Sequence, residues 1–256
     1  MNPVILRYIR KILFSGIRVA FPNESPRQKL ARFLYAQSIE ELFKVLDIRT
    51  VIDVGANRGQ YRDFIRNHIC FQGIIISFEP IKELSTYLRH RSIQEDRWIV
   101  YDVALGAKDC DVDLNFMKDD RCSSLHMPLH SEIFEEGNEI DHVEPVSMRR
   151  LDGILGEIRR THDLGNIFLK LDTQGHDLEV VKGISDFTQI AAIQSEVSSV
   201  PIYENIPTIA ESLQFFKERR FEVAGMFPVN HDTLNRVVEF DCVMVKSRGT
   251  SPTRIV

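Results

Sequence analysis

Acidic residues recur where apolar runs end along this 256-residue chain. Five of them follow segments with the composition of β-strands: Asp53, Glu79, Asp102, Asp172 and Glu196. The carboxyl ends of parallel strands meet at one edge of a sheet, so we expect these side chains to converge there. Such an edge repels a pyrophosphate and favours a ligand that carries positive charge.

The segment TVIDVGANRGQY, residues 50–61, turns through two glycines directly after the first acid. It departs from the dinucleotide fingerprint G-x-G-x-x-G, because Asn57 and Gln60 stand where that pattern needs glycine. Gly55 and Gly59 still allow the backbone to approach a ligand, and helix-terminal N–H groups can hold a carboxylate. With Asp53 as acceptor, the turn matches a ligand with a carboxylate, an ammonium and a nearby positive centre. S-adenosylmethionine has all three, although Asp53 and Asn57 are also suited to capping the next helix.

Two further acids match other parts of an adenosyl ligand. Glu79, in SFEP, ends the second strand-like run, where an acid accepts hydrogen bonds from a ribose diol. That role alone does not distinguish a nucleotide from an adenosyl ligand. Asp102, in YDVALG, follows the third run and is a candidate for the adenine amino group or a plain turn acid.

The run NIFLKLD, residues 166–172, carries the strongest candidates for chemistry at a methyl acceptor. Strand alternation puts Lys170 and Asp172 on one face, and a lysine in a buried strand needs a charged partner. We interpret Asp172 as the base or as the hydrogen-bond anchor of the acceptor. Lys170 would orient Asp172 or stabilise developing negative charge. The alternative is an ion pair that only stiffens the strand end.

Several nearby residues are weaker candidates. His176 follows Gly175 on the turn after that strand and is the second choice for the base. Glu196 is expected to line the acceptor pocket. Asp172, His176 and Glu196 together offer ligands for a divalent metal ion, but their spacing does not indicate a metal site.

A polar, aperiodic segment over residues 117–142 is predicted to be a substrate loop or lid. Ser123 and Ser124 are its candidate acceptor contacts. Its histidines, at positions 126, 130 and 142, are expected to be mostly solvated. Asp177, on the helix predicted after residue 176, is interpreted as a partner of the helix dipole rather than a catalytic group.

The elements that must position these residues alternate between strand-like and helix-like runs. This order predicts a doubly wound α/β fold with a mostly parallel sheet. The last two runs, 221–227 and 237–245, are too close for a helical crossover and should pair antiparallel. We therefore predict a helical extension over residues 1–49, a main domain over 50–246 and a flexible tail over 247–256.

Composition limits the class of protein. A formal net charge of -5 and a pI near 5.9 argue against a nucleic-acid partner. The four cysteines, Cys70, Cys110, Cys122 and Cys242, are far apart, which indicates neither a zinc site nor a disulfide framework. This cysteine usage favours a reducing compartment, and we expect a cytoplasmic protein.

Residues 1–20 have the pattern of a basic amphipathic helix, interrupted by arginine and lysine before any run reaches spanning length. Its apolar face is expected to pack on the domain or on a second subunit. The alternative is peripheral contact with the inner face of a membrane. The sequence does not determine the oligomeric state.

An ordered series of motifs resembles the FkbM-type methyltransferases, a branch of the class I S-adenosylmethionine-dependent methyltransferases. The series is DVGANRG, FEP, VALG, LDGIL, KLDTQGHDLEVVKG and EVSSVPIYE, over about residues 50–245. The resemblance implies a seven-stranded sheet with an antiparallel final hairpin. It also implies that Asp53, Gly55, Asn57 and Gly59 surround the methionyl group, Glu79 the ribose, and Asp102 to Ala104 the adenine.

The resemblance further implies O-methylation of a sugar, glycan or natural product. Neither residues 1–49 nor the 117–142 loop matches a motif, so these parts are expected to select the acceptor. Two other interpretations remain open on the sequence alone. A nicotinamide-dependent oxidoreductase would need the missing third glycine, and a binding module without catalysis would hold S-adenosylmethionine without turnover.

Overall fold

A computed structural model describes residues 26–129 and 139–247 of the chain. The predicted basic helix over residues 1–20 and nearly all of the predicted tail lie outside the described residues. The described residues divide into two compact units, one made of residues 26–47 and 63–71 and the other of residues 48–62, 72–129 and 139–247. Each unit is described by itself.

The first unit contains helix α2 (Pro26–Val45) and most of helix α3 (Gln60–Asn67). Aromatic contacts hold it together. The ring of Tyr35 stacks on Phe64 with centroids 5.2 Å apart, and Phe43 meets Phe71 edge-on at 5.3 Å. Among the residues that the structure describes, no helix has the length and apolar character needed to cross a membrane.

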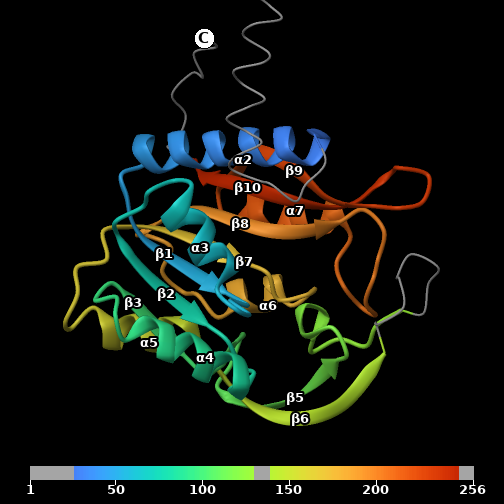
Figure 1. Ribbon diagram of the computed structural model, residues 1–256, viewed down its shortest axis with the longest axis horizontal. Coiled ribbons are helices and arrows are strands. Elements are labelled where there is room, and N and C mark those ends of the chain that lie inside the picture. The colour runs from blue at the N-terminus through green and yellow to red at the C-terminus, as the bar shows by residue number, and fades with distance from the viewer. Residues whose placement is uncertain (1–25, 130–138, 248–256) are drawn as a thin grey trace, which may run out of the picture. The chain divides into compact units, whose positions relative to one another are not determined.

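The second unit is built on a seven-stranded sheet with the order β3-β2-β1-β7-β8-β10-β9. Its strands are β1 (Ile48–Val54), β2 (Ile74–Phe78), β3 (Trp98–Tyr101), β7 (Asn166–Leu171), β8 (Ile190–Ser198), β9 (Phe221–His231) and β10 (Val237–Lys246). Neighbouring strands are parallel, except that β10 runs antiparallel to both β8 and β9. The predicted mostly parallel sheet with a final antiparallel hairpin is confirmed (Figure 1).

Helices in this unit bury apolar faces against the sheet. They are α4 (Lys82–Ser92), α5 (Leu151–Ile158), α6 (Asp177–Lys182) and α7 (Ile209–Glu218). The main core joins side chains of α5, α6 and α7, such as Leu151, Val180 and Phe216, to buried strand residues such as Leu169. These strands read as nearly continuous apolar runs, as expected for strands covered on both faces.

A second, three-stranded sheet was not predicted from the sequence. It has the order β4-β6-β5, with β4 (Ala104–Leu105), β5 (Cys110–Met117) and β6 (Ile140–Arg149). Figure 1 shows β5 and β6 as a curved pair set apart from the large sheet. β6 is mostly exposed and includes Pro145, so it lacks the apolar alternation that signals a strand. The segment WIVYDVAL is divided between β3 in the large sheet and β4 in the small one.

The strand order places a topological switch beside β1. From β1 the chain proceeds through β2 to β3 on one side, and then returns to β7 and β8 on the other. Ligands of open α/β sheets bind beyond the carboxyl ends of the strands at such a switch. The residues after β1, β2 and β7 are therefore the candidates for contact with a ligand.

Candidate active site

A cavity opens at this switch point, with about 610 Å³ of empty space that includes open solvent. It lies at the carboxyl ends of β1, β2 and β7 and is covered by the segment that follows β5. Its walls are formed by Val54, Gly55, Asn57, Phe78, Glu79, Pro80, Ile81, Val103, Ala104, Leu105, Leu114, Asp120, Arg121, Ser123, Ser124, Leu125, Asp172, Thr173, Gln174 and His176. All of these residues belong to the second unit.

The glycine turn contributes backbone to the cavity wall. Gly55 has φ +78°, and its amide donates to the Phe78 carbonyl at 3.0 Å. A Cβ at this position would lie only 2.0 Å from the carbonyl oxygen of Asp172, so the residue must be glycine for the ends of β1 and β7 to meet. Gly59 does not line the cavity, because its α-carbon faces Leu88 and Arg91.

Glu79 ends β2 at the predicted place, with only 4% of its surface exposed. One carboxylate oxygen accepts from the backbone amide of Asn57 at 2.7 Å, and the other from that of Ile81 at 2.9 Å. Burial raises the pKa of Glu79 to about 7, although the two amides partly oppose this shift. Each oxygen keeps a lone pair, so the group can still accept hydrogen bonds from a diol in the cavity.

The neighbouring wall is apolar and suits a flat aromatic ring. It is formed by Ile81, Val103, Leu114 and Leu125, with Ala104 beside them. Asp102 does not take part, because it is exposed and pairs with Arg89 at 2.5 Å. Its predicted contact with adenine is therefore not supported by the geometry, whereas Ala104 lies where it was expected.

Asp53 is placed beneath the cavity rather than in its wall. Its carboxylate is fully buried and lies 3.3 Å from Nζ of Lys170. Burial raises the pKa of Asp53, and the charge of Lys170 opposes that shift. The predicted direct contact with a ligand ammonium is not supported, and Asp53 instead acts through Lys170.

Lys170 connects Asp53 to the cavity. Its ammonium donates to Oδ2 of Asp172 at 3.0 Å, and only 7% of its side chain is exposed. Burial alone lowers the pKa of Lys170, but Asp172 and Asp53 outweigh it, so that the net pKa is raised. Lys170 is therefore a permanent cation between two carboxylates, and the predicted pair with Asp172 is present.

Gln174 was not singled out from the sequence, although it lies in the quoted KLDTQG string. Its amide donates to Oδ1 of Asp172 at 2.9 Å and to Glu196 at 3.3 Å. The hydroxyl of Tyr203 lies 2.9 Å from Gln174 Oε1 and orients that amide. Both oxygens of Asp172 are thus held by donors, which stabilises the carboxylate and fixes its direction toward the cavity.

His176 lines the cavity and was expected to be the second choice for a base. It is largely buried, and neither of its ring nitrogens has a hydrogen-bond partner. Burial, with a smaller contribution from the nearby His126, lowers its pKa to about 4. The rings of His126 and His176 lie 5.6 Å apart.

The expectation that the loop histidines are solvated is wrong for His126. It is half-buried, and its Nε2 is buried without a hydrogen-bond partner. His142 is exposed beside Asp141 and Glu144, as expected, and residue 130 lies outside the described residues.

Glu196 faces a second, smaller cavity of about 380 Å³ on the other side of the β7–α6 turn. It does not line the main cavity, so it reaches Asp172 only through Gln174. Burial raises the pKa of Glu196 well above its usual value, and the charge of Asp172 adds to the shift. The expectation that Glu196 contacts the acceptor directly is not supported.

The carboxylate of Asp177 is buried beside this turn and accepts hydrogen bonds there. It is not at the surface, where a partner of the helix dipole was expected. Its carboxylate accepts from the amide and hydroxyl of Thr173 and from the hydroxyl of Ser195. It therefore joins the turn to β8.

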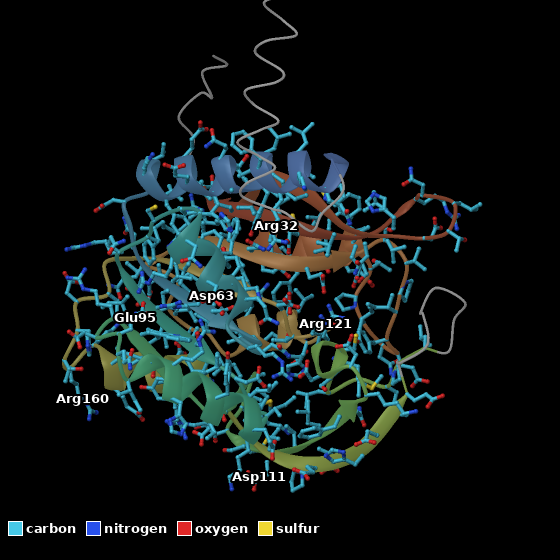
Figure 2. All side chains as sticks on the ribbon, viewed as in Figure 1. Arg32, Asp63, Glu95, Asp111, Arg121 and Arg160 are labelled. Atoms are coloured by element: carbon cyan, nitrogen blue, oxygen red, sulfur yellow. The ribbon has the colours of Figure 1, made fainter. Side chains whose placement is uncertain are left out.

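The segment after β5 covers the cavity and is anchored on both sides. Asp120, in the short helix η1 (Asp120–Cys122), accepts from Arg58 at 2.6 Å and from the Asn57 amide at 3.2 Å. On the other side, the Ser124 hydroxyl donates to the Gln174 carbonyl at 2.7 Å. In Figure 2, Arg121 marks this segment and Asp111 marks the small sheet.

The two serines, predicted as acceptor contacts, line the cavity, but their hydroxyls are already engaged. Ser124 is 1% exposed, and the hydroxyl of Ser123 accepts from the amide of Met117 at 3.2 Å. Among residues 26–129 and 139–247, no group of three or more histidine, cysteine, aspartate or glutamate side chains is arranged to hold a metal ion.

Comparison with protein families matches residues 53–223 to the methyltransferase FkbM domain, which is more than half of the chain. The chain belongs to the methyltransferase FkbM family. The match begins at Asp53 and extends into β9, so the whole cavity lies within the FkbM domain. No curated protein matches the chain.

Comparison with solved structures also gives matches. Methyltransferase FkbM from Methylobacillus flagellatus KT is 16% identical over 78% of this chain and 44% of its own, with a TM-score of 0.47. TehB from Haemophilus influenzae is 8% identical over 82% of this chain and 62% of its own, with a TM-score of 0.41. Magnesium protoporphyrin IX methyltransferase (ChlM) from Synechocystis PCC 6803, with bound SAM, is 8% identical over 96% of this chain and all of its own, with a TM-score of 0.43. This FkbM chain thus spans less than half the length of the M. flagellatus structure.

Proposed function

We propose that this protein transfers the methyl group of S-adenosylmethionine to a hydroxyl group of a sugar, glycan or natural product. The observation that carries the proposal is that two held carboxylates face one cavity at the switch point. Glu79 ends β2 beside an apolar slot, and Asp172 follows β7 on the opposite side. Glu79 suits an adenosyl ligand, and Asp172 suits a methyl acceptor.

The residues present fit S-adenosylmethionine. Glu79 accepts hydrogen bonds from the ribose hydroxyls, and the apolar wall with Ala104 holds the adenine. The backbone at Gly55 and Asn57 is close enough for the methionyl group. When bound, the cofactor supplies an electrophilic methyl group on a sulfonium.

At the other end, Asp172 anchors the acceptor. Lys170 and Gln174 hold its two oxygens, so the carboxylate presents its remaining lone pairs in a fixed direction. Methyl transfer is an in-line displacement, and most of its acceleration can come from holding the acceptor oxygen close to the methyl carbon. We assign Asp172 this positioning task by its contact with a hydroxyl of the acceptor.

The test is transfer of tritiated methyl from S-adenosylmethionine into a fractionated cell extract, followed by identification of the labelled product. We expect label in a hydroxyl-bearing small molecule or glycan. Binding of S-adenosylhomocysteine without transfer to any fraction would indicate a binding module instead.

Replacing Asp172, which anchors the acceptor, should reduce methyl transfer far more than cofactor binding. For Asp172→Asn we expect methyl transfer to fall about 100-fold, because the acceptor loses its orientation. Affinity for S-adenosylhomocysteine, measured by calorimetry, should change less than about threefold. Unchanged transfer would rule out the role of Asp172.

Cofactor affinity should depend on pH through Glu79. The ionised carboxylate accepts from both ribose hydroxyls, and its pKa is about 7 in the folded protein. The ionised fraction then falls about tenfold between pH 8 and pH 6, and affinity should weaken by about the same factor. Calorimetry with S-adenosylhomocysteine and with 5′-methylthioadenosine, which has the ribose but no amino acid group, measures this dependence.

Two variants serve as controls for this measurement. Glu79→Gln should bind more weakly and show almost no change between pH 6 and pH 8. Asp102→Asn should bind like the wild type, because Asp102 faces solvent and pairs with Arg89. A flat pH dependence in the wild type would contradict the role of Glu79.

A further inference from the structure

His176 lines the main cavity, and the ring of His126 lies beside it. The two residues come from separate segments: His126 from the segment after β5, and His176 from the turn between β7 and α6. Their rings lie 5.6 Å apart at an interplanar angle of 47°. Three of their four ring nitrogens are buried without a hydrogen-bond partner: Nε2 of His126 and both nitrogens of His176.

Unpartnered buried polar groups are costly, and a native structure keeps them where they serve a ligand or a reaction. His176 lies in the cavity wall together with Asp172, Gln174 and Ser124, at the end opposite the adenosyl slot. A neutral imidazole there offers a free lone pair to the acceptor. Of the other polar side chains at this end, Asp172 uses its remaining lone pairs to bind the acceptor, and the Ser124 hydroxyl donates to the backbone carbonyl of Gln174.

We propose that His176 is the base that removes the hydroxyl proton of the acceptor, and that His126 is the residue that positions it. The inference rests on the proposed methyl transfer and states which residue takes the hydroxyl proton of the acceptor. Asp172 binds the acceptor but does not take that proton, because Lys170 and Gln174 stabilise its anionic form.

The proposed step is balanced. The acceptor oxygen forms a bond to the methyl carbon while the carbon–sulfur bond breaks and its electron pair stays on sulfur. The hydroxyl proton passes to a ring nitrogen of His176. One positive charge disappears from the sulfonium and one appears on the imidazolium, so the net charge of the site is unchanged.

A weak base is sufficient for this step. The hydroxyl proton becomes strongly acidic as its oxygen gains the methyl group, so a low-pKa imidazole can accept it late in the reaction. The charged groups that act on His176 are His126, and Glu179 and Lys182 of α6. Burial and His126 lower the pKa of His176, whereas Glu179 raises it and stabilises the imidazolium that forms.

The first experiment needs no acceptor. Sinefungin carries an amine where S-adenosylmethionine carries the reactive methyl group, and S-adenosylhomocysteine has neither. In protein with ¹⁵N-labelled histidine, the ring signals of His176, assigned from the His176→Gln spectrum, should be those of a neutral imidazole at pH 6.5. Sinefungin should shift them and S-adenosylhomocysteine should not. A charged His176, or one that does not respond to sinefungin, would overturn the assignment.

The second experiment uses the labelled extract fraction found for the wild type. His176→Gln should lower kcat about 100-fold while KM for S-adenosylmethionine changes little. His126→Gln should move the acidic limb of the pH–rate profile to higher pH, because a neighbour that lowers the pKa of His176 is gone. A merely structural role for His126 would not move that limb.

Exposed His142 provides the matched control, and His142→Gln should leave rate and pH profile unchanged. Full activity of His176→Gln would overturn the inference and leave the proposed methyl transfer standing. Absence of transfer by the wild type would overturn both.

Discussion

Gly55→Ala is expected to destabilise the protein by about 3–5 kcal/mol, the sum of backbone strain and overpacking at one half-buried position. Gly55 has φ +78°, where an alanine is strained. Its new Cβ would also lie 2.0 Å from the carbonyl oxygen of Asp172, and backbone cannot rotate away as a side chain can. The ends of β1 and β7 would have to separate, which widens the site on both the cofactor and the acceptor side.

Urea denaturation measures this effect as a fall in the midpoint at unchanged slope. Gly156→Ala is the matched control. Gly156 lies in α5, and a Cβ there would meet no atom within 4 Å. Because alanine favours a helix over glycine, the control should keep its stability or gain up to about 1 kcal/mol. Equal stability of the two variants would contradict the geometry of the turn.

Lys170→Met should lower the free energy of unfolding by about 3–5 kcal/mol, as much as Gly55→Ala, because it leaves the buried carboxylate of Asp53 without a counter-charge. Asp53 is 0% exposed, and the ammonium of Lys170 is the cation 3.3 Å from it. Methyl transfer should also fall, since Asp172 loses the donor that holds Oδ2. Stability is measured by urea denaturation and transfer with the labelled extract.

The same substitution at an exposed pair is the control. Lys182 pairs with Glu179 on α6, and both side chains are well exposed, so Lys182→Met should cost less than about 1 kcal/mol. The double variant Asp53→Asn with Lys170→Met should be more stable than Lys170→Met alone, because it removes the unpaired charge. Additive losses in this cycle would contradict the pairing.

The pH dependence of Lys170→Met has a defined sign. Burial raises the pKa of Asp53, and losing the lysine raises it further. A carboxylate whose folded pKa lies above its unfolded value destabilises the protein above the unfolded pKa, and the penalty disappears as the pH falls below it. The variant should therefore be closest to the wild type at low pH.

The cavity has two ends with different chemistry. We propose that the end with Glu79 and an apolar wall is the cofactor side. The end with Asp172 and His176 is the proposed acceptor side, where Gln174 and Tyr203 orient Asp172. The segment after β5 touches both ends, through Asp120 at the glycine turn and Ser124 at the β7–α6 turn. Selection of the acceptor is therefore expected to depend on that segment.

Sequence alone was sufficient for the large sheet, the final hairpin and the edge at which the site lies. These features follow from local patterns, because buried parallel strands are continuous apolar runs and their connections fix the order of elements. The cavity wall includes Glu79, Gly55, Asn57, Ala104 and Asp172, each of which lies at or next to the end of such a strand.

Only the tertiary structure decided which of these side chains reach the cavity. Asp53 and Asp172 both follow apolar runs, yet Asp53 is buried beneath the cavity and Asp172 lines it. The small sheet, the Tyr203–Gln174 contact and the His126–His176 pair join segments that are distant in sequence. Such contacts depend on how loops pack over the sheet and leave no periodic pattern in the chain. Burial, which sets the charge of His176 and Glu79, arises only from that packing.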